Sequence, residues 1–333
     1  MNSGYTYSMR LVVPFLRQLR TYPQISDELL QPLVEMDLES RLPVDVLHEL
    51  LSGAIAMTGD PLIGLKAAAK IERGDYGALE YAASTAATSR EALEVIARYL
   101  HLVNDGLQCS IEVDGDRAIV RLVNAVFLPP AAEDFELASF FWTMRLHNRQ
   151  NIPFDAYFTQ AAPADVSSFI ACLPSNATVH FGCGWSGFSF AAEHLQNSVP
   201  VADPKLHELL RSHADHLLQA LPKPRSLADR VGAYLMVHLQ GASATLSATA
   251  RELHMSERTL ARRLEQEGTS FSQLLEQTRR QLAMRYVEHS DLALSEVAFL
   301  LGFSQVSAFH RAFKRWTQTT PLEHRARARG VKS

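Results

Sequence analysis

One pattern is written twice near the end of the chain, and it constrains the fold more than any other feature. In the second copy, Ser295 can cap a short helix that buries Val297 and Leu301 on one face. Gly302 then ends this helix, because a left-handed residue costs least when it has no Cβ. A second helix begins at about Ser304 and buries three apolar residues at i, i+4 and i+7, namely Phe309, Phe313 and Trp316. The pattern predicts two short helices joined by a tight turn.

The first copy, which begins at Leu246, is built in the same way. Ser256 caps its second helix, which buries Leu260 and Leu264. His254 lies in the turn, where the backbone needs a conformation that residues other than glycine seldom adopt, although histidine is among the more tolerant. We therefore expect backbone strain at His254.

A long amphipathic helix connects the two copies. The segment 270–273 has the form of a capping box, and the helix continues to about His289. About 19 residues at ~1.5 Å each make a rod of roughly 28 Å. Such a rod can hold two helices roughly one turn of DNA apart, near the ~34 Å between successive major-groove faces. The region therefore predicts a module that contacts two successive major grooves.

The outward faces of the two second helices are polar and basic. The planar guanidinium of arginine can donate two hydrogen bonds to O6 and N7 of guanine. The residues expected to contact base edges are Arg258, Thr259, Arg262, Ser307, His310 and Arg311. Residues expected to hold phosphates are Arg263, Lys314 and Arg315. For each of these cations, a solvated surface charge is the alternative interpretation.

Roughly residues 226–327 resemble the DNA-binding domain of the AraC/XylS family of bacterial transcription regulators. The residues that carry the resemblance are Gly302-Phe303, Ser307, Phe309, Arg311, Phe313 to Trp316, and Thr320-Pro321 through Arg325. The departures are His254, Ala308, Gln318 and His324, where the family commonly has Gly, Tyr, Gly and Tyr. The resemblance implies an all-α double helix-turn-helix domain at 226–333 that binds double-stranded DNA. RNA polymerase is a further partner if the protein is an activator.

The distribution of charge divides the chain into two parts. Residues 1–224 carry a formal net charge of −10, whereas residues 225–333 carry +6. An acidic module joined to a basic one is typical of a sensor fused to a nucleic-acid binder. Taken alone, these charges are better explained by ordinary variation between two domains.

Residues 1–202 predict an α+β domain, with helices first and a small mixed sheet later. The expected helices are 26–36, 43–57, 61–70, 77–87, 89–103, 133–148 and 164–173. The expected strands are 107–113, 117–123, 154–160, 178–181 and 187–191. Asp114-Gly115 is a strong hairpin signal between the first two strands.

Roughly residues 20–205 look like an effector domain found in the same family and usually labelled arabinose-binding. The matching segments are 74–81, 85–99, 179–182 and 188–190. This resemblance implies a sensor for a small-molecule effector, but a domain label does not identify arabinose as its ligand.

An effector pocket needs apolar walls and a few fixed polar groups. The candidates for effector binding are Trp142, Arg145, Phe158, His180 and Trp185, and Phe140, Tyr157 and Phe188 lie in the same strand-rich half. For each of them, packing in the core is the alternative interpretation.

Residues 203–225 predict a helix followed by a proline-stiffened linker from Pro222 to Ser226. The helix has residues at coiled-coil spacing, namely Leu206, Leu210, His213, Leu217 and Ala220. This stripe indicates either a helix that forms a homodimer or a helix that packs on its own sensor domain.

The motifs of several other protein classes are incomplete. His48 and His207 each begin a zinc-protease pattern without its second histidine, and Gly184 to Gly187 lacks the spacing of a nucleophile elbow. The three cysteines have no CxxC spacing, and no apolar run reaches the ~18 residues of a membrane span. We therefore expect a cytoplasmic protein that is not an enzyme and needs no metal or cofactor. A regulator that is constitutive or controlled by a protein partner is an alternative, as is an enzyme domain tethered to DNA.

Overall fold

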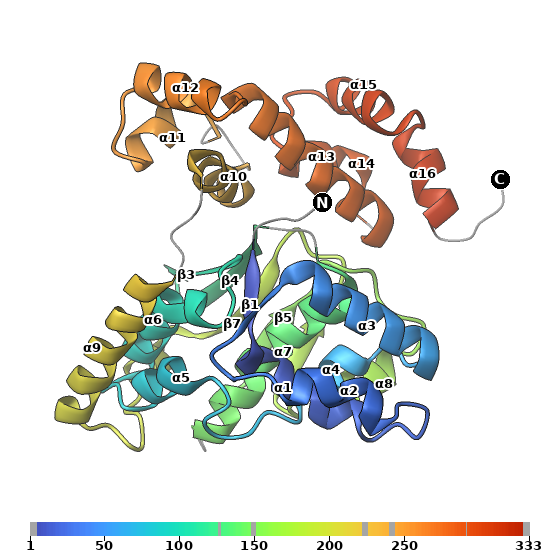
Figure 1. Cartoon of the computed structure of the whole chain (residues 1–333). Helices are drawn as coiled ribbons and strands as arrows, with labels where there is room; N and C mark the ends of the chain where they lie inside the picture. The colour runs from blue at the N-terminus through green and yellow to red at the C-terminus, as the bar shows by residue number, and fades with distance from the viewer. Residues whose placement is uncertain are drawn as a thin grey trace. The chain divides into compact units, whose positions relative to one another are not determined.

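The computed structural model describes residues 5–125, 128–147, 151–221, 226–239, 244–290 and 292–328. They form two compact units (Figure 1). The first comprises Met1–Phe158, Ala162–His180 and Trp185–Leu221, and the second contains every helix from α10 onward.

The first unit is an α+β domain, as predicted. Its helices are α1 (Met9–Leu19), α2 (Asp27–Val34), α3 (Val44–Thr58), α4 (Ile63–Ala68), α5 (Gly77–Ser84), α6 (Ser89–Tyr99), α7 (Pro130–His147), α8 (Val166–Ala171) and α9 (Pro204–Ala220). Short 3-10 turns lie at η1 (Leu100–Leu102) and η2 (Ala192–Gln196). The sequence analysis missed α1, because Pro14 within it is a signal that ordinarily argues against a helix.

The described residues of this unit form two sheets. Strands β1 (Thr6–Ser8) and β2 (Arg41–Pro43), which were not predicted, form a two-stranded sheet. The larger sheet has the order β3-β4-β7-β5-β6 and consists of β3 (Leu107–Asp114), β4 (Arg117–Asn124), β5 (Phe154–Tyr157), β6 (Ala177–His180) and β7 (Ser186–Ala191). Strands β5 and β6 are parallel and the other pairs are antiparallel, so the sheet is mixed as predicted.

The hairpin between β3 and β4 lies one residue later than its sequence signal suggests. Asp114 pairs with Arg117, which leaves Gly115 and Asp116 as the two loop residues. Gly115 has φ +58°, and a glycine at the first loop position is typical of a type II′ hairpin turn. Asp114 therefore belongs to the strand.

Helix α7 is the centre of the first unit (Figure 1). Most of its residues from Ala131 to Phe141 are buried, as expected of a helix that is covered on every side. The ring of Phe141 lies 4.4 Å from that of Phe154 on β5 and 5.5 Å from that of Phe188 on β7, measured between centroids. These contacts pack α7 against the larger sheet.

Helix α9 packs on α5 and α6. Its buried residues are His207 and Ala214, two turns apart on one face. The coiled-coil stripe lies elsewhere: Leu206, His213 and Ala220 are exposed, and Leu210 and Leu217 are half-buried. The helix thus packs on its own domain and leaves most of the predicted stripe uncovered within the described residues.

The second unit consists of helices in its described residues. They are α10 (Leu227–His238), α11 (Leu246–Glu252), α12 (Glu257–Gln266), α13 (Phe271–His289), α14 (Leu294–Leu300), α15 (Val306–Thr317) and α16 (Pro321–Ala328). Pair α11/α12 and pair α14/α15 are the two predicted helix-turn-helix copies, and α13 lies between them in the chain and in space (Figure 1). The prediction of a double helix-turn-helix domain is confirmed.

The caps of these helices follow the sequence signals with one exception. Ser256 accepts a hydrogen bond from the Thr259 N–H, and Ser270 accepts one from the Gln273 N–H, as predicted. The prediction that Ser295 caps the first helix of the second copy was wrong. Helix α14 begins one residue earlier, because the Glu296 carboxylate accepts a hydrogen bond from the Ala293 N–H and stabilises that start.

Candidate DNA-binding surface and effector cavity

Helix α12 presents three cations to solvent. Leu260 and Leu264 are fully buried in the core of the first copy, and this orients the opposite face of α12 outward. Arg258, Arg262 and Arg263 are exposed. Thr259, by contrast, is half-buried and its hydroxyl lies 2.8 Å from that of the capping Ser256.

Helix α15 presents a second polar face. Phe309 and Phe313 are buried, whereas Ser307, Arg311 and Lys314 are exposed. Figure 1 shows this helix at the far end of the domain from α12, with α13 between them. No side-chain hydrogen bond or ion pair engages Arg258, Arg262 or Arg311 within the described residues, so their guanidinium donors are accessible to a ligand.

Two predicted contact residues on α15 differ from this pattern. Arg315 donates to the Glu276 carboxylate at 2.5 Å, and the Trp316 indole donates to the same oxygen at 2.8 Å. His310 is half-buried, and its Nε2 atom is buried with no hydrogen-bond partner among the described residues. A DNA contact by Arg315 therefore requires exchange of a carboxylate for a phosphate.

The turns of the two copies have the same backbone hand. Gly302 has φ +68° and His254 has φ +53°, which confirms the left-handed conformations expected from the sequence. Gln318, at the end of α15, has φ +61°. His254 and Gln318 are both positions where the resembling family commonly has glycine, and in this chain a side chain occupies the left-handed region at each of them.

Arg279 on α13 holds the second turn in place. Its guanidinium donates to the carbonyls of Leu301 at 2.9 Å and Gly302 at 2.8 Å, and lies 4.7 Å from the centroid of the Phe303 ring. Burial lowers the pKa of Arg279. The sequence analysis missed this residue, because its two acceptors are backbone groups more than twenty residues away and leave no local signal.

A cavity of about 570 Å³ lies inside the first unit. Its walls come from α5, α6, α7 and the strands β5 and β7, and most of the side chains in them are apolar. On α7, the lining residues are Glu136, Ser139, Phe140, Phe141, Thr143, Met144, Arg145 and His147. The volume falls within the ~300–1,000 Å³ typical of ligand pockets.

The wall of the cavity contains two buried carboxylates with several donors each. Glu136 accepts hydrogen bonds from the side-chain amides of Asn104 at 2.6 Å and Asn124 at 2.7 Å. Glu80 accepts from the backbone N–H groups of Gly74 and Tyr76 and lies 2.6 Å from Nε2 of His147. Burial by itself raises the pKa of Glu80, but these hydrogen bonds outweigh it and lower the pKa below its ordinary value.

Two hydroxyls in the wall differ from these carboxylates. Neither the Tyr76 hydroxyl nor Oγ1 of Thr143 makes a hydrogen bond of normal geometry within the described residues, although both atoms are buried. Burial raises the pKa of Tyr76 strongly, while the neighbouring Ser139 hydroxyl acts in the opposite direction. A buried hydroxyl without a partner destabilises a protein by about 1–3 kcal/mol.

Of the five residues predicted to bind an effector, Arg145 is among those that line this cavity, and it is exposed. Phe140 and Phe188 also line it. Trp142, Phe158, His180 and Trp185 are not among the lining residues. The lining residues on α5 and α6 were not identified from the sequence, because helical periodicity shows that a face is buried and not whether a cavity lies beside it.

The four other candidates lie in packing contacts. The Trp142 indole donates to the carbonyl of Cys172 at 3.3 Å, and Phe158 packs edge-on against Phe169. His180 lies 2.9 Å from the Asp155 carboxylate and stacks on Tyr157, and the Trp185 ring lies 4.4 Å from the same tyrosine ring.

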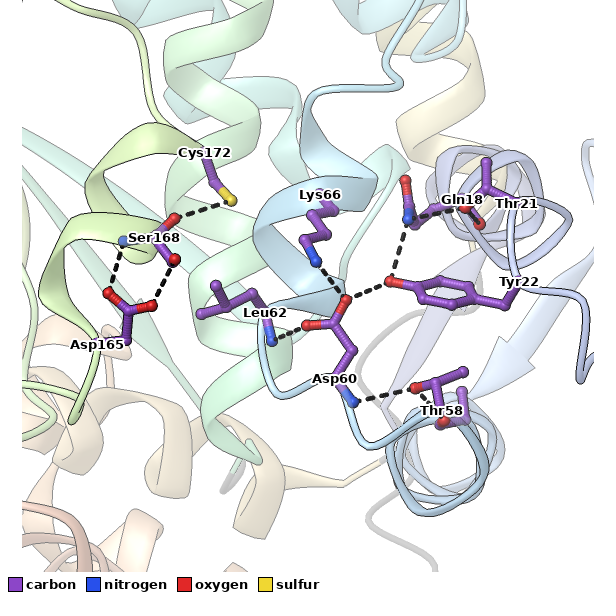
Figure 2. A network of polar contacts seen from close by, with 11 residues as sticks. Gln18, Thr21, Tyr22, Thr58, Asp60, Leu62, Lys66, Asp165, Ser168 and Cys172 are labelled. Carbon is purple, nitrogen blue, oxygen red and sulfur yellow. Dashed lines mark hydrogen bonds and ion pairs between the residues drawn. The ribbon is translucent and has the colours of Figure 1, made fainter.

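A second cluster of polar side chains lies near α4 and α8 (Figure 2). Asp60 accepts hydrogen bonds from Lys66 at 2.5 Å, from the Leu62 N–H at 3.0 Å and from the hydroxyl of Tyr22. Burial and the Asp60 contact raise the pKa of Tyr22 to about 12, so this hydroxyl stays protonated at neutral pH. The carboxylate is occupied by three donors, which indicates a structural role.

The second half of the same network is also occupied. The Sγ atom of Cys172 lies 3.4 Å from the carbonyl of Ser168, whose hydroxyl donates to Asp165 (Figure 2). Burial raises the pKa of Cys172, which disfavours the reactive thiolate. Among the described residues, no group of three or more His, Cys, Asp or Glu side chains could hold a metal, and no helix there is long and apolar enough to span a membrane.

Comparison with known proteins gives matches over both units. The family model described as the arabinose-binding domain of AraC transcription regulator, N-terminal, matches residues 28–199, and one described as a helix-turn-helix domain matches residues 249–327. The chain is 28% identical to the ornithine utilization regulator of Pseudomonas aeruginosa over 287 residues, which cover 84% of this chain and 82% of that protein.

A second relative is the HTH-type transcriptional regulator VirS of Mycobacterium tuberculosis. It is 29% identical over 333 residues, which cover 97% of this chain and 94% of that protein. Among solved structures, the transcriptional regulator CdpR from Pseudomonas aeruginosa matches 93% of this chain and 97% of its own, with a TM-score of 0.43 and 21% identity.

Proposed function

The chain belongs to the AraC family of transcription regulators, and from this premise we propose that a small molecule in the cavity of its first unit modulates DNA binding by its second. DNA-binding regulation of transcription is the function of the family. The observation that carries the effector is the cavity of about 570 Å³, with apolar walls and a few fixed polar groups.

The exposed cations of α12 and α15 support contacts of two kinds with DNA, some to base edges and others to phosphates. Arg258, Arg262 and Arg311 contact base edges, because their guanidinium groups are exposed and make no side-chain hydrogen bond or ion pair within the described residues. Arg263 and Lys314 hold phosphates. Helix α13, with 19 residues, is roughly 28 Å long and lies between the two contact helices (Figure 1).

The remaining predicted residues contribute under narrower conditions. Ser307 is exposed and donates to a base or phosphate directly. Arg315 contacts a phosphate after it leaves Glu276, and Thr259 and His310 contact DNA at the edge of the surface because they are half-buried.

The test of DNA binding is fluorescence anisotropy of the full chain on DNA from just upstream of its own gene and on random DNA, at two salt concentrations. We expect the upstream fragment to bind at least ~10³ times more tightly, which is within the usual range of specificity ratios. Equal and weak binding to both, with and without metabolites, would contradict the proposal that this operator is regulated by an effector.

The test of the effector uses two matched variants on α6. Ala92 lines the cavity and Ala97 does not, so Ala92→Phe fills the site whereas Ala97→Phe adds the same side chain elsewhere on the helix. A metabolite that binds the first unit should raise the melting temperature of the wild-type chain and of Ala97→Phe by mass action, and should not affect Ala92→Phe. A constitutive or partner-controlled regulator, the alternative, would show no ligand-dependent change in DNA affinity.

The exposed stripe on α9, with Leu206 at 42% exposure, supports a homodimer. Light scattering of the full chain would detect this dimer.

The place of action and the other partners follow from membership of the family. The protein acts in the cytoplasm, where its DNA is, and contacts RNA polymerase if it activates transcription. It acts without catalysis, so an enzyme domain tethered to DNA is the disfavoured alternative.

A further inference from the structure

The chemistry of the cavity wall indicates which class of molecule it accepts, and this step rests on the proposed effector function. The wall is mostly apolar, formed by residues such as Leu93, Ile96, Phe140 and Phe188. A sugar would leave many of its hydroxyls without partners against such a wall. The apolar lining therefore disfavours a ligand that is polar over its whole surface.

The charges in the wall disfavour an anionic ligand. Glu80 and Glu136 are buried at 3% and 5% exposure, and both line the cavity. Of the basic side chains in the wall, His147 contacts Glu80, Nδ1 of His194 lies 3.2 Å from the side-chain amide of Asn197, and Arg145 is exposed. A ligand carboxylate or phosphate in the cavity would thus share its wall with two buried carboxylates, while solvent screens the charge of Arg145.

An ammonium group is disfavoured for a different reason. The oxygens of Glu80 and Glu136 already accept hydrogen bonds from backbone and side-chain donors. A cationic ligand would lose its hydration in an apolar cavity. It would not gain a carboxylate whose oxygens are free to accept hydrogen bonds from all of its N–H groups. Charge of either sign is therefore unfavourable in this site.

A row of hydroxyls supplies the polar part of the site. Ser139 and Thr143 lie one helical turn apart on α7, and the Tyr76 hydroxyl lies beside Ser139. The Ser139 hydroxyl donates to the carbonyl of Phe135 at 2.6 Å and also contacts the Tyr76 oxygen, whereas no acceptor among the described residues receives a hydrogen bond from the Tyr76 or Thr143 hydroxyl. Two hydroxyl donors are thus available at one wall of an apolar cavity.

We infer that the cavity binds an uncharged, mainly apolar molecule whose hydroxyl or carbonyl oxygen accepts hydrogen bonds from Tyr76 and Thr143. The apolar body of the ligand packs against α6 and the rings of β5 and β7. Its oxygen accepts from hydroxyls that have no acceptor among the described residues.

The ligand experiment compares four probes on the full chain by thermal shift and titration calorimetry. 1-Octanol, octanoate and octylammonium share one apolar chain and differ in the charge of the head group, and L-arabinose is the fully polar probe. We expect 1-octanol to raise the melting temperature, octanoate and octylammonium to bind at least about tenfold more weakly, and L-arabinose to give no shift. Equal or tighter binding of a charged probe or of arabinose would overturn the inference, and so would a lack of binding by 1-octanol.

Matched variants identify the hydroxyls. Tyr76→Phe and Thr143→Val each remove a hydroxyl with little change of volume, and each should weaken 1-octanol binding by about threefold to tenfold. Because these hydroxyls donate to no acceptor among the described residues, the melting temperature without ligand should stay the same or rise. Tyr99→Phe is the control, since the buried Tyr99 donates to Asp215 at 2.9 Å, and this variant should melt at a lower temperature.

The outcomes separate this inference from the proposed function. If Tyr76→Phe and Thr143→Val destabilise the free protein as Tyr99→Phe does and leave 1-octanol binding unchanged, the assigned hydroxyls are wrong. If 1-octanol binds as expected but does not alter DNA affinity, the ligand class stands and the regulatory role falls. If a charged metabolite binds and alters DNA affinity, the regulatory role stands and the ligand class falls.

Discussion

Gly302 allows a sharp test of the turn in the second helix-turn-helix copy. Its φ is +68°, and a Cβ at this position would lie 2.6 Å from the carbonyl oxygen of Leu239 at the end of α10. Gly268, after α12, has a similar φ of +76°, but a Cβ there would meet no atom within 4 Å. The two glycines therefore share a backbone conformation and differ in the space around them.

Alanine at each position separates strain from contact. The left-handed conformation costs about 1–2 kcal/mol for a residue with a Cβ, and this cost applies to both variants. In Gly302→Ala the Leu239 backbone must also move, which adds about 1–3 kcal/mol, as overpacking typically does. We expect the free energy of unfolding of the second unit to fall by about 2–5 kcal/mol in Gly302→Ala and by about 1–2 kcal/mol in Gly268→Ala.

The assay is urea unfolding of the full chain followed by tryptophan fluorescence. The chain contains three tryptophans, of which Trp316 lies in the second unit, so a Trp142→Phe, Trp185→Phe background reports on that unit. If the two alanine variants lose the same free energy of unfolding, the Leu239 carbonyl moves aside without a measurable energetic penalty. Unchanged stability in both would refute the argument that these turns need a left-handed residue.

Three further predictions concern DNA contact, backbone strain and acid stability. Arg311→Ala should lower the binding free energy on the specific site by about 1–3 kcal/mol and relax one base preference, whereas Lys314→Ala should weaken binding to specific and random DNA alike. Fluorescence anisotropy on both DNAs measures these changes. Equal losses on the two DNAs for Arg311→Ala would remove this residue from the base-contacting set. His254→Gly should raise the free energy of unfolding by about 0.5 kcal/mol, because relief of about 1–2 kcal/mol of left-handed strain exceeds the greater freedom of glycine in the unfolded chain, and a urea midpoint below wild type would contradict this. The pKa of Glu80 is lower in the folded state, so its stabilisation is present above the unfolded pKa of about 4.3 and is lost as the pH falls through the folded pKa. In Glu80→Gln the melting temperature should be lower at neutral pH and should fall less steeply on acidification. An unchanged dependence of the melting temperature on acid pH would contradict the role of the Glu80 hydrogen bonds.

Local signals were sufficient for the DNA-binding half. The serine caps at 256 and 270, the left-handed residues in both turns, and the buried residues of α12 and α15 all follow from interactions within a few residues of one another. Helical periodicity and capping act over one or two turns, so they can be recognised in the sequence alone. The exception at Ser295 is a competition between adjacent residues, in which Glu296 fixed the start of the helix.

Tertiary structure decided the features that bear on regulation. The cavity is lined by residues from Leu11 to Val199, and whether Tyr76 and Thr143 find a partner depends on which distant segments pack beside them. Arg279 is one arginine among many in the sequence until the fold brings the carbonyls of Leu301 and Gly302 to it. The sequence by itself determined that this chain has a double helix-turn-helix domain and an α+β partner domain, because periodicity and capping are local. The place of the cavity, and the lack of an acceptor for its two hydroxyls among the described residues, were decided by long-range packing, which no local pattern encodes.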